Sequence, residues 1–242
     1  MNTSSSILIV DDEEDACRNM ADILGDFGYH VDIAFNGINA LELARSHTYD
    51  VALLDLKMPG MDGLTLYRQI KKFSAGTVAI IVTAYAAKAT ATEALSAGAV
   101  SVFPKPVDFP RLLTIMNQAL LRPMVLIVDD DEDLCENLWD LLNEHQYRVC
   151  LAHDEVDAAI CLRQHKHDVV LIDMKLPQGD GRGVFQNAQQ ADPEAHVIAI
   201  TAAGTESDNF VQEIIAHANN AVCYKPFDVP NLLGTISRLT RK

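Results

Sequence analysis

The sequence predicts an α/β protein of two domains, each built around a doubly wound parallel sheet of five strands. Three observations predict this fold. The second half of the chain repeats the first, short apolar runs alternate with helical patterns in both halves, and matching polar residues follow the apolar runs. Because parallel strands carry their carboxyl ends to one edge, we expect these polar residues to gather there.

Five polar residues recur at nearly constant spacing in the 242-residue chain. The first copy holds Asp11, Asp12, Asp55, Thr83 and Lys105, and the second holds Asp129, Asp130, Asp173, Thr201 and Lys225. The shift is 118 residues for the aspartates and the threonine, and 120 for the lysine. This period exceeds the roughly 20–50 residues of solenoid repeats and matches one ordinary domain. We therefore expect domain 1 over residues 1–122 and domain 2 over residues 123–242.

The first domain begins with the apolar run Ile7–Val10, and each later run of this kind is likewise followed by a helical pattern. Near-continuous runs such as Val51–Leu54 are typical of strands that are buried on both faces. The strands are expected at 7–10, 30–34, 51–55, 78–83 and 100–103. The helices are expected at 14–27, 37–46, 63–73, 86–97 and 108–121. Pro123 then ends the last helix.

The second domain repeats this order of elements. Its strands are expected at 124–128, 148–152, 168–172, 196–201 and 221–224. Its helices are expected at 132–145, 155–165, 182–191, 206–217 and 228–239. The larger shift of the lysine predicts two extra residues in or before the fourth of these helices.

Five βα units of this size commonly adopt the flavodoxin-like strand order 2-1-3-4-5. In such sheets, ligands bind beyond the carboxyl ends of the strands, near the point where the strand order reverses. Each repeated polar residue ends a predicted strand or lies just after one. Strands 1, 3, 4 and 5 therefore carry the whole set to one edge of each sheet.

Composition excludes several classes of protein. The formal net charge of −15 disfavours binding to nucleic acid and to anionic membranes. No apolar run reaches the ~18 residues of a membrane span, and the polar N-terminus lacks the basic segment of a secretory signal. The chain has five cysteines, an odd number, and none of them forms a CxxC pair. We interpret their spacings as not repeating. They predict reduced thiols in a cytoplasmic protein and disfavour a zinc site.

Three carboxylates are predicted to meet in each domain. Like charges at close range raise one another's pKa unless a cation intervenes, and one lysine cannot balance three of them. A hard divalent cation such as Mg²⁺ would, because it binds carboxylates together with phosphate oxygens. A metal beside a carboxylate, a lysine and a threonine hydroxyl forms a phosphoryl site, in which the carboxylate can be the nucleophile.

Other interpretations were weighed against this one. A single Asp-Asp pair more often caps a helix, and Asp12 could cap the helix expected near Glu14, but capping does not explain five matched positions in two copies. A phosphatase of the haloacid-dehalogenase type needs Asp-x-Asp-x-Thr after the first strand, whereas this chain has Asp11-Asp12-Glu13-Glu14-Asp15. A third alternative is an interaction module whose second copy no longer accepts phosphate.

The combined motifs resemble the receiver domain of two-component response regulators. The matching stretches are ILIVDDEED, LLDLKMPGMDG, VTAY and FPKP in the first copy, and VLIVDDDED, LIDMKLPQGDG, ITAA and CYKP in the second. The resemblance covers nearly the whole chain. It implies that Asp55 and Asp173 accept phosphate from a phosphohistidine, and that the chain is a phosphoacceptor regulatory protein that assists its own phosphorylation and dephosphorylation rather than an enzyme in the ordinary sense.

The same resemblance assigns the remaining residues. Asp12 and Asp130 would hold Mg²⁺ together with the acceptor aspartate and a backbone carbonyl at Lys57 or Lys175, and Asp11 and Asp129 would act through metal-bound water. Thr83 and Thr201 would bond the phosphoryl group, and Lys105 and Lys225 would pair with it. Many receivers have an aromatic residue three positions before the lysine. Here Val102 and Val222 stand there, and Phe103 and Tyr224 are expected on the opposite face of their strands.

The expected partners are a histidine kinase or a phosphotransfer protein and a downstream protein, with no nucleic acid and no membrane. A homodimer is left open. An alternative is that the chain is the receiver part of a longer hybrid kinase or cyclase.

Overall fold

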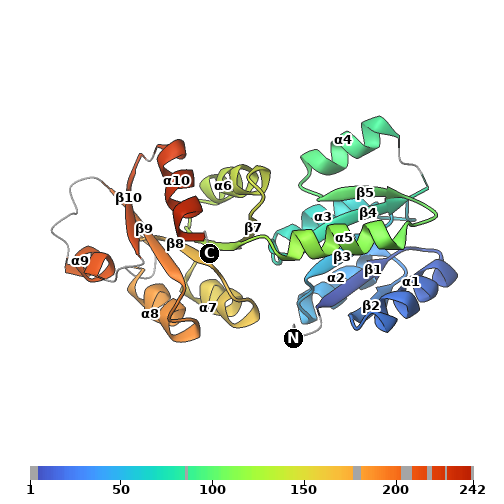
Figure 1. Cartoon of the computed structure of the whole chain (residues 1–242), viewed down its shortest axis with the longest axis horizontal. Coiled ribbons are helices and arrows are strands. Elements are labelled where there is room, and N and C mark those ends of the chain that lie inside the picture. Colours follow the sequence, from blue (N-terminus) through green and yellow to red (C-terminus); the bar gives the residue numbers. More distant parts are fainter. Residues whose placement is uncertain are drawn as a thin grey trace. The chain divides into compact units, whose positions relative to one another are not determined.

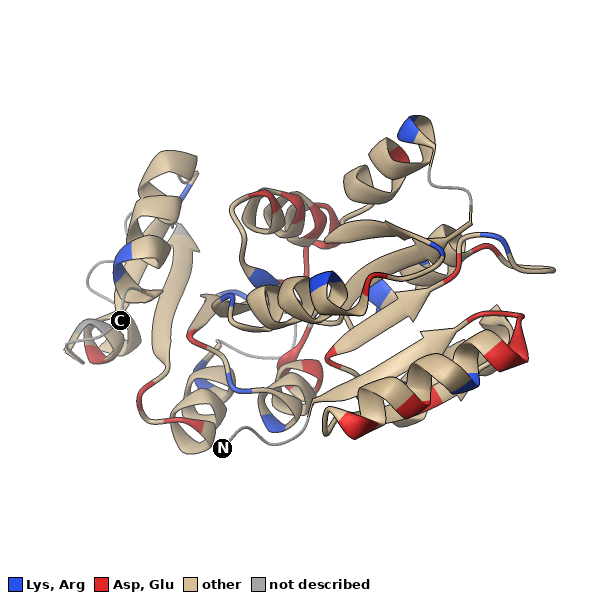
Figure 2. Ribbon diagram, turned by 45° about the vertical axis from the view of Figure 1, so that its right-hand side comes forward, with Lys and Arg blue, Asp and Glu red and all other residues tan. Residues whose placement is uncertain are grey.

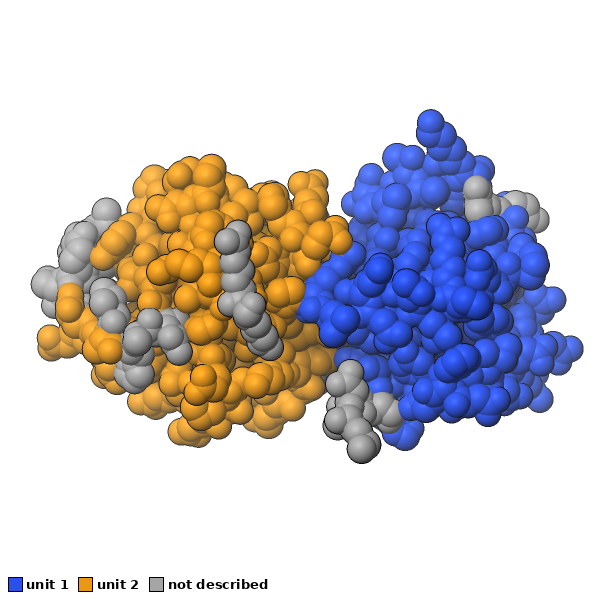
Figure 3. All heavy atoms as spheres, viewed as in Figure 1, with its two compact units in different colours: residues 1–122 blue, residues 123–242 orange. Residues whose placement is uncertain are grey.

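The computed structural model describes residues 5–84, 87–176, 181–202, 209–216, 220–226 and 228–240. The chain divides into two compact units, residues 1–122 and residues 123–242, which Figure 3 distinguishes by colour.

Unit 1 alternates strands and helices along its whole length (Figure 1). Its strands are β1 (Ser6–Val10), β2 (His30–Ala34), β3 (Val51–Leu54), β4 (Val78–Thr83) and β5 (Ser101–Pro104). Its helices are α1 (Glu14–Asp26), α2 (Gly37–Ser46), α3 (Gly63–Lys71), α4 (Lys88–Ser96) and α5 (Phe109–Leu120).

Unit 2 repeats the pattern. Its strands are β6 (Met124–Val128), β7 (Arg148–Ala152), β8 (Val169–Asp173), β9 (His196–Ala202) and β10 (Ala221–Lys225). Its helices are α6 (Glu132–Glu144), α7 (Glu155–Gln164), α8 (Arg182–Ala191), α9 (Asn209–Ala216) and α10 (Val229–Thr240).

Both sheets have the predicted order and are parallel throughout. The order is β2-β1-β3-β4-β5 in unit 1 and β7-β6-β8-β9-β10 in unit 2, and every strand pair is parallel. The predicted fold class is therefore confirmed. In unit 1, Val10 at the end of β1 pairs with Ala34 and with Leu54. This register brings the ends of the neighbouring strands level, so the residues that follow them share one edge.

Each sheet is covered by helices on both faces. In unit 1, buried side chains of α1 and α5 form one apolar cluster with the sheet, and those of α2, α3 and α4 form the other. In unit 2, α7, α8 and α9 share one cluster. The strands in Figure 2 are almost wholly tan, while acidic and basic residues lie on the helices and loops. Burial of the strands on both faces explains their near-continuous apolar sequence.

Several helices begin where an aspartate side chain accepts a hydrogen bond from a backbone N–H three residues later, the preferred arrangement at a helix N-terminus. The capping residues are Asp62, Asp108, Asp131 and Asp154. Helix ends differ from the predicted ones by a few residues, most in α9, which begins at Asn209. Residues 203–208 and 217–219, where two extra residues were expected, lie outside the described part of the chain.

The two units differ at the amino-terminal edge of the sheet, before β3 and β8. In unit 1, the buried Tyr49 donates a hydrogen bond to Asp32 Oδ2 at 2.7 Å. The matching positions in unit 2, 118 residues later, hold His167 and Cys150. His167 is 2% exposed, and neither ring nitrogen has a hydrogen-bond partner of good geometry within the described residues. Burial lowers the pKa of His167 to about 3, the charges of His165 and Arg148 lower it further, and an interaction with the backbone of His165 opposes them in part.

We expect this histidine to make unit 2 sensitive to acid. The folded-state pKa of about 3 lies below the ordinary value of 6.5, so the unfolded chain takes up the proton first as the pH falls. The stability contributed by neutral His167 is present above pH 6.5 and is lost below it, by about 2 kcal/mol at pH 5. The measurement is denaturant unfolding at pH 7 and pH 5, followed by the fluorescence of the single tryptophan, Trp139, which is buried in α6. His167→Phe should lose this part of the pH dependence, and an unchanged dependence in that variant would contradict the assignment.

Candidate functional sites

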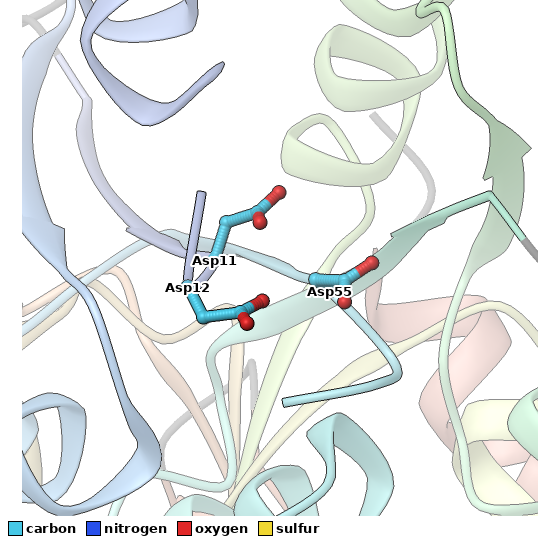
Figure 4. A group of neighbouring side chains, drawn as sticks. All are labelled: Asp11, Asp12 and Asp55. Atoms are coloured by element: carbon cyan, nitrogen blue, oxygen red, sulfur yellow. The ribbon is translucent and has the colours of Figure 1, made fainter. Parts of the chain in front are cut away.

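The three predicted carboxylates of unit 1 meet at one edge of the sheet. Asp11 and Asp12 follow β1, Asp55 follows β3, and one oxygen from each lies within 4.8 Å of the others. Figure 4 shows the three side chains next to one another at the strand ends. Asp11 and Asp55 are buried, and Asp12 is exposed. The sequence brings them together because Asp11 N bonds to Ala34 O and Asp55 N bonds to Val10 O, which continues the sheet hydrogen bonds one residue past the strands.

Lys105 reaches this cluster from the end of β5. Its Nζ lies 2.5 Å from Asp11 Oδ2 and 3.6 Å from Asp55 Oδ1. Its backbone N–H donates to Thr83 O at 3.0 Å, which fixes it beside the end of β4. Burial opposes protonation, but the hydrogen bond and charge of Asp11, with the charges of Asp55 and Glu13, raise the pKa of Lys105 overall. The lysine is therefore charged at neutral pH.

Backbone N–H groups orient the two buried carboxylates. Lys57 N donates to Asp55 Oδ2 at 3.0 Å, and Glu13 N donates to Asp11 Oδ1 at 3.1 Å. Burial raises the pKa of Asp55 although Lys105 and this N–H of Lys57 lower it, and the negative charge of Asp11 raises it again. Burial is thus the main cause of the raised pKa of Asp55, and the charge of Asp11 adds to it.

The alternative role of Asp12 as a helix cap is wrong. The residue before α1 is Glu13, and no side chain caps this helix through a hydrogen bond. In unit 2 the cap of α6 is Asp131, which again differs from the second aspartate of the pair, Asp130. The exposed carboxylates of Asp12 and Asp130 thus face the cluster without serving the helices that follow.

Unit 2 repeats the arrangement. Asp129, Asp130 and Asp173 form a second group of carboxylates within 4.8 Å. Lys225 Nζ lies 2.9 Å from Asp129 Oδ2 and 2.9 Å from Asp173 Oδ2, so here the lysine bridges both buried acids evenly. Lys175 N donates to Asp173 Oδ1 at 3.0 Å, and Asp131 N donates to Asp129 Oδ1 at 3.0 Å.

One threonine of the repeated set lies at the same edge of each sheet. Thr83 is the last residue of β4, Thr201 is the last residue but one of β9, and both are buried. The residues two positions after them, Tyr85 and Ala203, lie outside the described residues. All the repeated polar residues thus sit at the carboxyl ends of strands, in the places that the parallel order predicts.

Sequence reasoning missed two cysteines at this edge. Cys17 Sγ donates to Asp11 O at 3.4 Å, and Cys135 Sγ donates to Asp129 O at 3.3 Å. These cysteines are 118 residues apart, so our interpretation that the cysteine spacings do not repeat is wrong for this pair, and the shift of the repeat would have found them. Burial raises the pKa of each thiol to about 12, which keeps both protonated and able to donate.

Phe103 lies on the predicted face of its strand, but Tyr224 does not. Phe103 is 1% exposed and packs with α1 and α5, whereas Val102 packs with the cluster on the other face. Tyr224, however, is two residues from Val222 in β10. Side chains alternate along a strand, so these two share one face, and the prediction that Tyr224 lies opposite is wrong.

The donor atoms of each cluster fit a hard divalent cation. They are all carboxylate oxygens, with a charged lysine at one side and exposed space at Asp12 or Asp130. Mg²⁺ prefers such oxygen ligands and keeps several waters in its coordination shell, which needs an open side. No histidine or cysteine joins either group among the described residues. The residues present therefore fit Mg²⁺.

Comparisons with known proteins agree with this geometry. A family model described as the response regulator receiver domain matches residues 7–117 and 125–237. A response regulator receiver protein of Anaeromyxobacter sp. (strain Fw109-5) is 32% identical over 235 residues, which are 97% of this chain and 95% of that protein.

Other relatives match a single unit. The transcriptional regulatory protein ZraR of Klebsiella oxytoca is 40% identical over 114 residues, 47% of this chain and 26% of ZraR; the chain thus spans about a quarter of that relative. A crystal structure of a CheY-like receiver domain protein from Methanospirillum hungatei JF-1 covers 49% of this chain and 94% of its own, with 33% identity and a TM-score of 0.47. Within the described residues, no helix is both long and apolar enough to cross a membrane. With the receiver model matched in both halves, the chain belongs to the response regulator receiver family, as a tandem of two receiver domains.

Proposed function

We propose that each unit accepts a phosphoryl group on an aspartate, Asp55 in unit 1 and Asp173 in unit 2, from a phosphohistidine of a histidine kinase or phosphotransfer protein. The observation that carries the proposal is the meeting of three carboxylates and one lysine at the same sheet edge in both units. An acidic cluster at one site could be structural. Two copies with the same partners indicate a shared chemistry.

In the proposed reaction, a carboxylate oxygen of Asp55 attacks phosphorus and the P–N bond to the donor imidazole breaks. The imidazole leaves with the electron pair and takes up a proton, and the aspartate becomes an acyl phosphate. The N–H of Lys57, which holds Asp55 Oδ2, leaves Oδ1 as the attacking oxygen. Asp12 and Asp55, with the backbone carbonyl of Lys57, would hold Mg²⁺, which would neutralise charge on the phosphoryl oxygens when bound.

Lys105 and Thr83 act on the transferred group. The ammonium of Lys105, 3.6 Å from Asp55 Oδ1, is close enough to pair with a phosphoryl oxygen once Asp55 carries phosphate. The Thr83 hydroxyl donates to another oxygen. In unit 2 Asp130, Asp173, Lys175, Thr201 and Lys225 have the same roles. Asp11 and Asp129 act through metal-bound water and hold the lysines.

The phosphorylated state is proposed to change contacts with a downstream protein, which makes the chain a cytoplasmic signalling protein. We also propose that Lys57 and Tyr85 shield the phosphate of unit 1 from water, and that unit 2, with Lys175 and Ala203, releases its phosphate faster. Tyr85 and Ala203 lie outside the described residues, so separate measurement of the two dephosphorylation rates decides this point.

The test of the function is labelling of the whole chain with a small phosphodonor such as acetyl phosphate. We expect phosphate on two aspartates per chain in the presence of Mg²⁺, because both clusters are complete, and almost none in the presence of a chelator. Intact mass and peptide mapping after reduction of the acyl phosphate measure the number and position of the groups. Uptake that does not need Mg²⁺, or that occurs elsewhere, would refute the proposal, and phosphate on Asp55 alone would show that unit 2 is silent.

A further inference from the structure

Unit 2 contains a cavity of about 290 Å³ at the sheet edge opposite to its carboxylates. The cavity lies between the C-terminal turns of α7 and α8, two helices that pack side by side (Figure 1). His165 and His167 line it from the segment before β8, and Ala188, Ala191 and Asp192 line it from α8 and its end. Asp173 stands at the far end of β8, roughly 13 Å from the first residue of that strand. The cavity is therefore separate from the phosphoacceptor site.

The same place in unit 1 holds larger side chains. The positions matching Ala188 and Ala191, 118 residues earlier, are Ile70 and Phe73. One backbone hydrogen bond is shared, since Ser74 N donates to Ile70 O at 2.8 Å and Asp192 N donates to Ala188 O at 2.9 Å, although α3 ends at Lys71 and α8 continues to Ala191. Unit 2 thus has two alanines where unit 1 has a buried isoleucine and a phenylalanine that is 41% exposed.

A cavity made by removing apolar groups takes an apolar molecule of the shape that was removed. In unit 1 the Phe73 ring lies under the guanidinium of Arg45, with the ring centre 5.7 Å from Cζ. Arg163 holds the matching position in unit 2 and lines the cavity. A guanidinium attracts the face of an aromatic ring. The cavity therefore offers a guanidinium at the position from which Arg45 covers an aromatic ring in unit 1.

His167 adds a polar requirement. It lines the cavity, is 2% exposed, and has two ring nitrogens without hydrogen-bond partners within the described residues. In unit 1 the hydroxyl of the matching Tyr49 donates a hydrogen bond to Asp32. Cys150 stands at the position of Asp32 in unit 2. A buried polar group without a partner costs free energy that a ligand regains by supplying one. A hydroxyl or ring N–H on the ligand would do so.

Apart from the guanidinium of Arg163, which would face the ring, the paired charges at the rim favour a neutral ligand. Lys166 Nζ and Asp192 Oδ2 form an ion pair of 2.9 Å, so these two groups balance each other. We propose that this cavity is a binding site for a small, neutral aromatic molecule that carries one hydroxyl or N–H group, such as a phenol or an indole. The ring occupies the place that Phe73 fills in unit 1, and the polar group reaches His167.

Phenol is the probe that tests the site, with the whole chain in the native state and ligand-observed NMR as the readout. We expect saturable binding of phenol, weaker binding of benzene, and loss of phenol binding in Ala191→Phe, which restores the unit 1 side chain. His167→Phe should bring phenol and benzene to similar affinity, because only phenol uses the ring nitrogen. Trp139 fluorescence verifies that unit 2 of each variant is folded.

Phe73→Ala is the matched control, because it changes the corresponding position of unit 1 and should leave the phenol site of unit 2 intact. Absence of saturable phenol binding to the native chain would overturn the proposal. So would binding that survives both Ala191→Phe and a second filling variant, Ala188→Ile, when either variant is folded.

Discussion

Replacing both proposed acceptor aspartates, Asp55→Asn and Asp173→Asn, is expected to abolish phosphoryl uptake, and either change alone should leave one phosphate per chain. An amide nitrogen replaces the attacking oxygen or its partner, and an amide is a far weaker nucleophile than a carboxylate. No neighbouring acid can take over in unit 1. Asp11 is buried and paired with Lys105 at 2.5 Å, and Asp12 lies at the exposed side, where the metal is expected. Phosphate per chain, measured by intact mass, gives the result.

Asp62→Asn serves as the control for this experiment. Asp62 lies on the loop after Asp55 and caps α3, with Oδ1 accepting from Thr65 N at 2.7 Å. Asparagine caps helices about equally well, so this variant loses the same charge without losing the helix or the acceptor. Uptake should stay at two groups. Phosphate retained by the double variant would show that the acceptor has been misassigned.

Gly63→Ala is expected to destabilise unit 1 by about 3 kcal/mol or more and to impair phosphorylation of Asp55. A Cβ at Gly63 would lie 2.2 Å from the backbone oxygen of Asp55 and 3.0 Å from its carbonyl carbon. Backbone atoms cannot turn away as the end of a flexible side chain can. The methyl group must therefore displace either α3 or Asp55, which lowers the stability of unit 1 and the phosphorylation of Asp55. Denaturant unfolding of unit 1 by circular dichroism and labelling at Asp55 measure the two effects.

Gly25→Ala is the matched substitution. Gly25 lies in α1, where a Cβ would meet nothing within 4 Å. Alanine is the better helix former, so this change should stabilise unit 1 by up to about 1 kcal/mol and leave labelling unchanged. Equal effects of the two substitutions would mean that the close approach of Gly63 to Asp55 has no functional consequence.

The acidic clusters could be predicted from sequence because strand ends in a parallel sheet have few alternatives. Once the apolar runs before Asp11 and Asp55 are strands 1 and 3, the order 2-1-3-4-5 makes them neighbours. The parts that could not be predicted depend on distances between side chains. Lys105 lies nearer to Asp11, whereas Lys225 is equidistant from its two acids, and no spacing in the sequence encodes that difference.

The wrong predictions, for the cysteine spacing and for the face of Tyr224, have a different cause. A count of all five cysteines conceals the pair Cys17 and Cys135, because the other three cysteines do not share its spacing of 118 residues. Tyr224 was placed by its closeness to Val222 in sequence, although a step of two residues in a strand returns to the same face. The cavity beside His167 needs the structure, because an alanine in a helix does not by itself show whether a neighbour fills the space.

The two ends of the parallel strands differ in how far the two units agree. At the carboxyl ends both units carry the same polar residues, whereas at the amino-terminal ends Ile70, Phe73 and Tyr49 of unit 1 correspond to Ala188, Ala191 and His167 of unit 2. Side chains at one end of such a sheet can differ without disturbing those at the other, since an apolar strand separates them. The two units of a tandem protein can therefore differ in what they recognise at one end while they keep the same acidic cluster at the other.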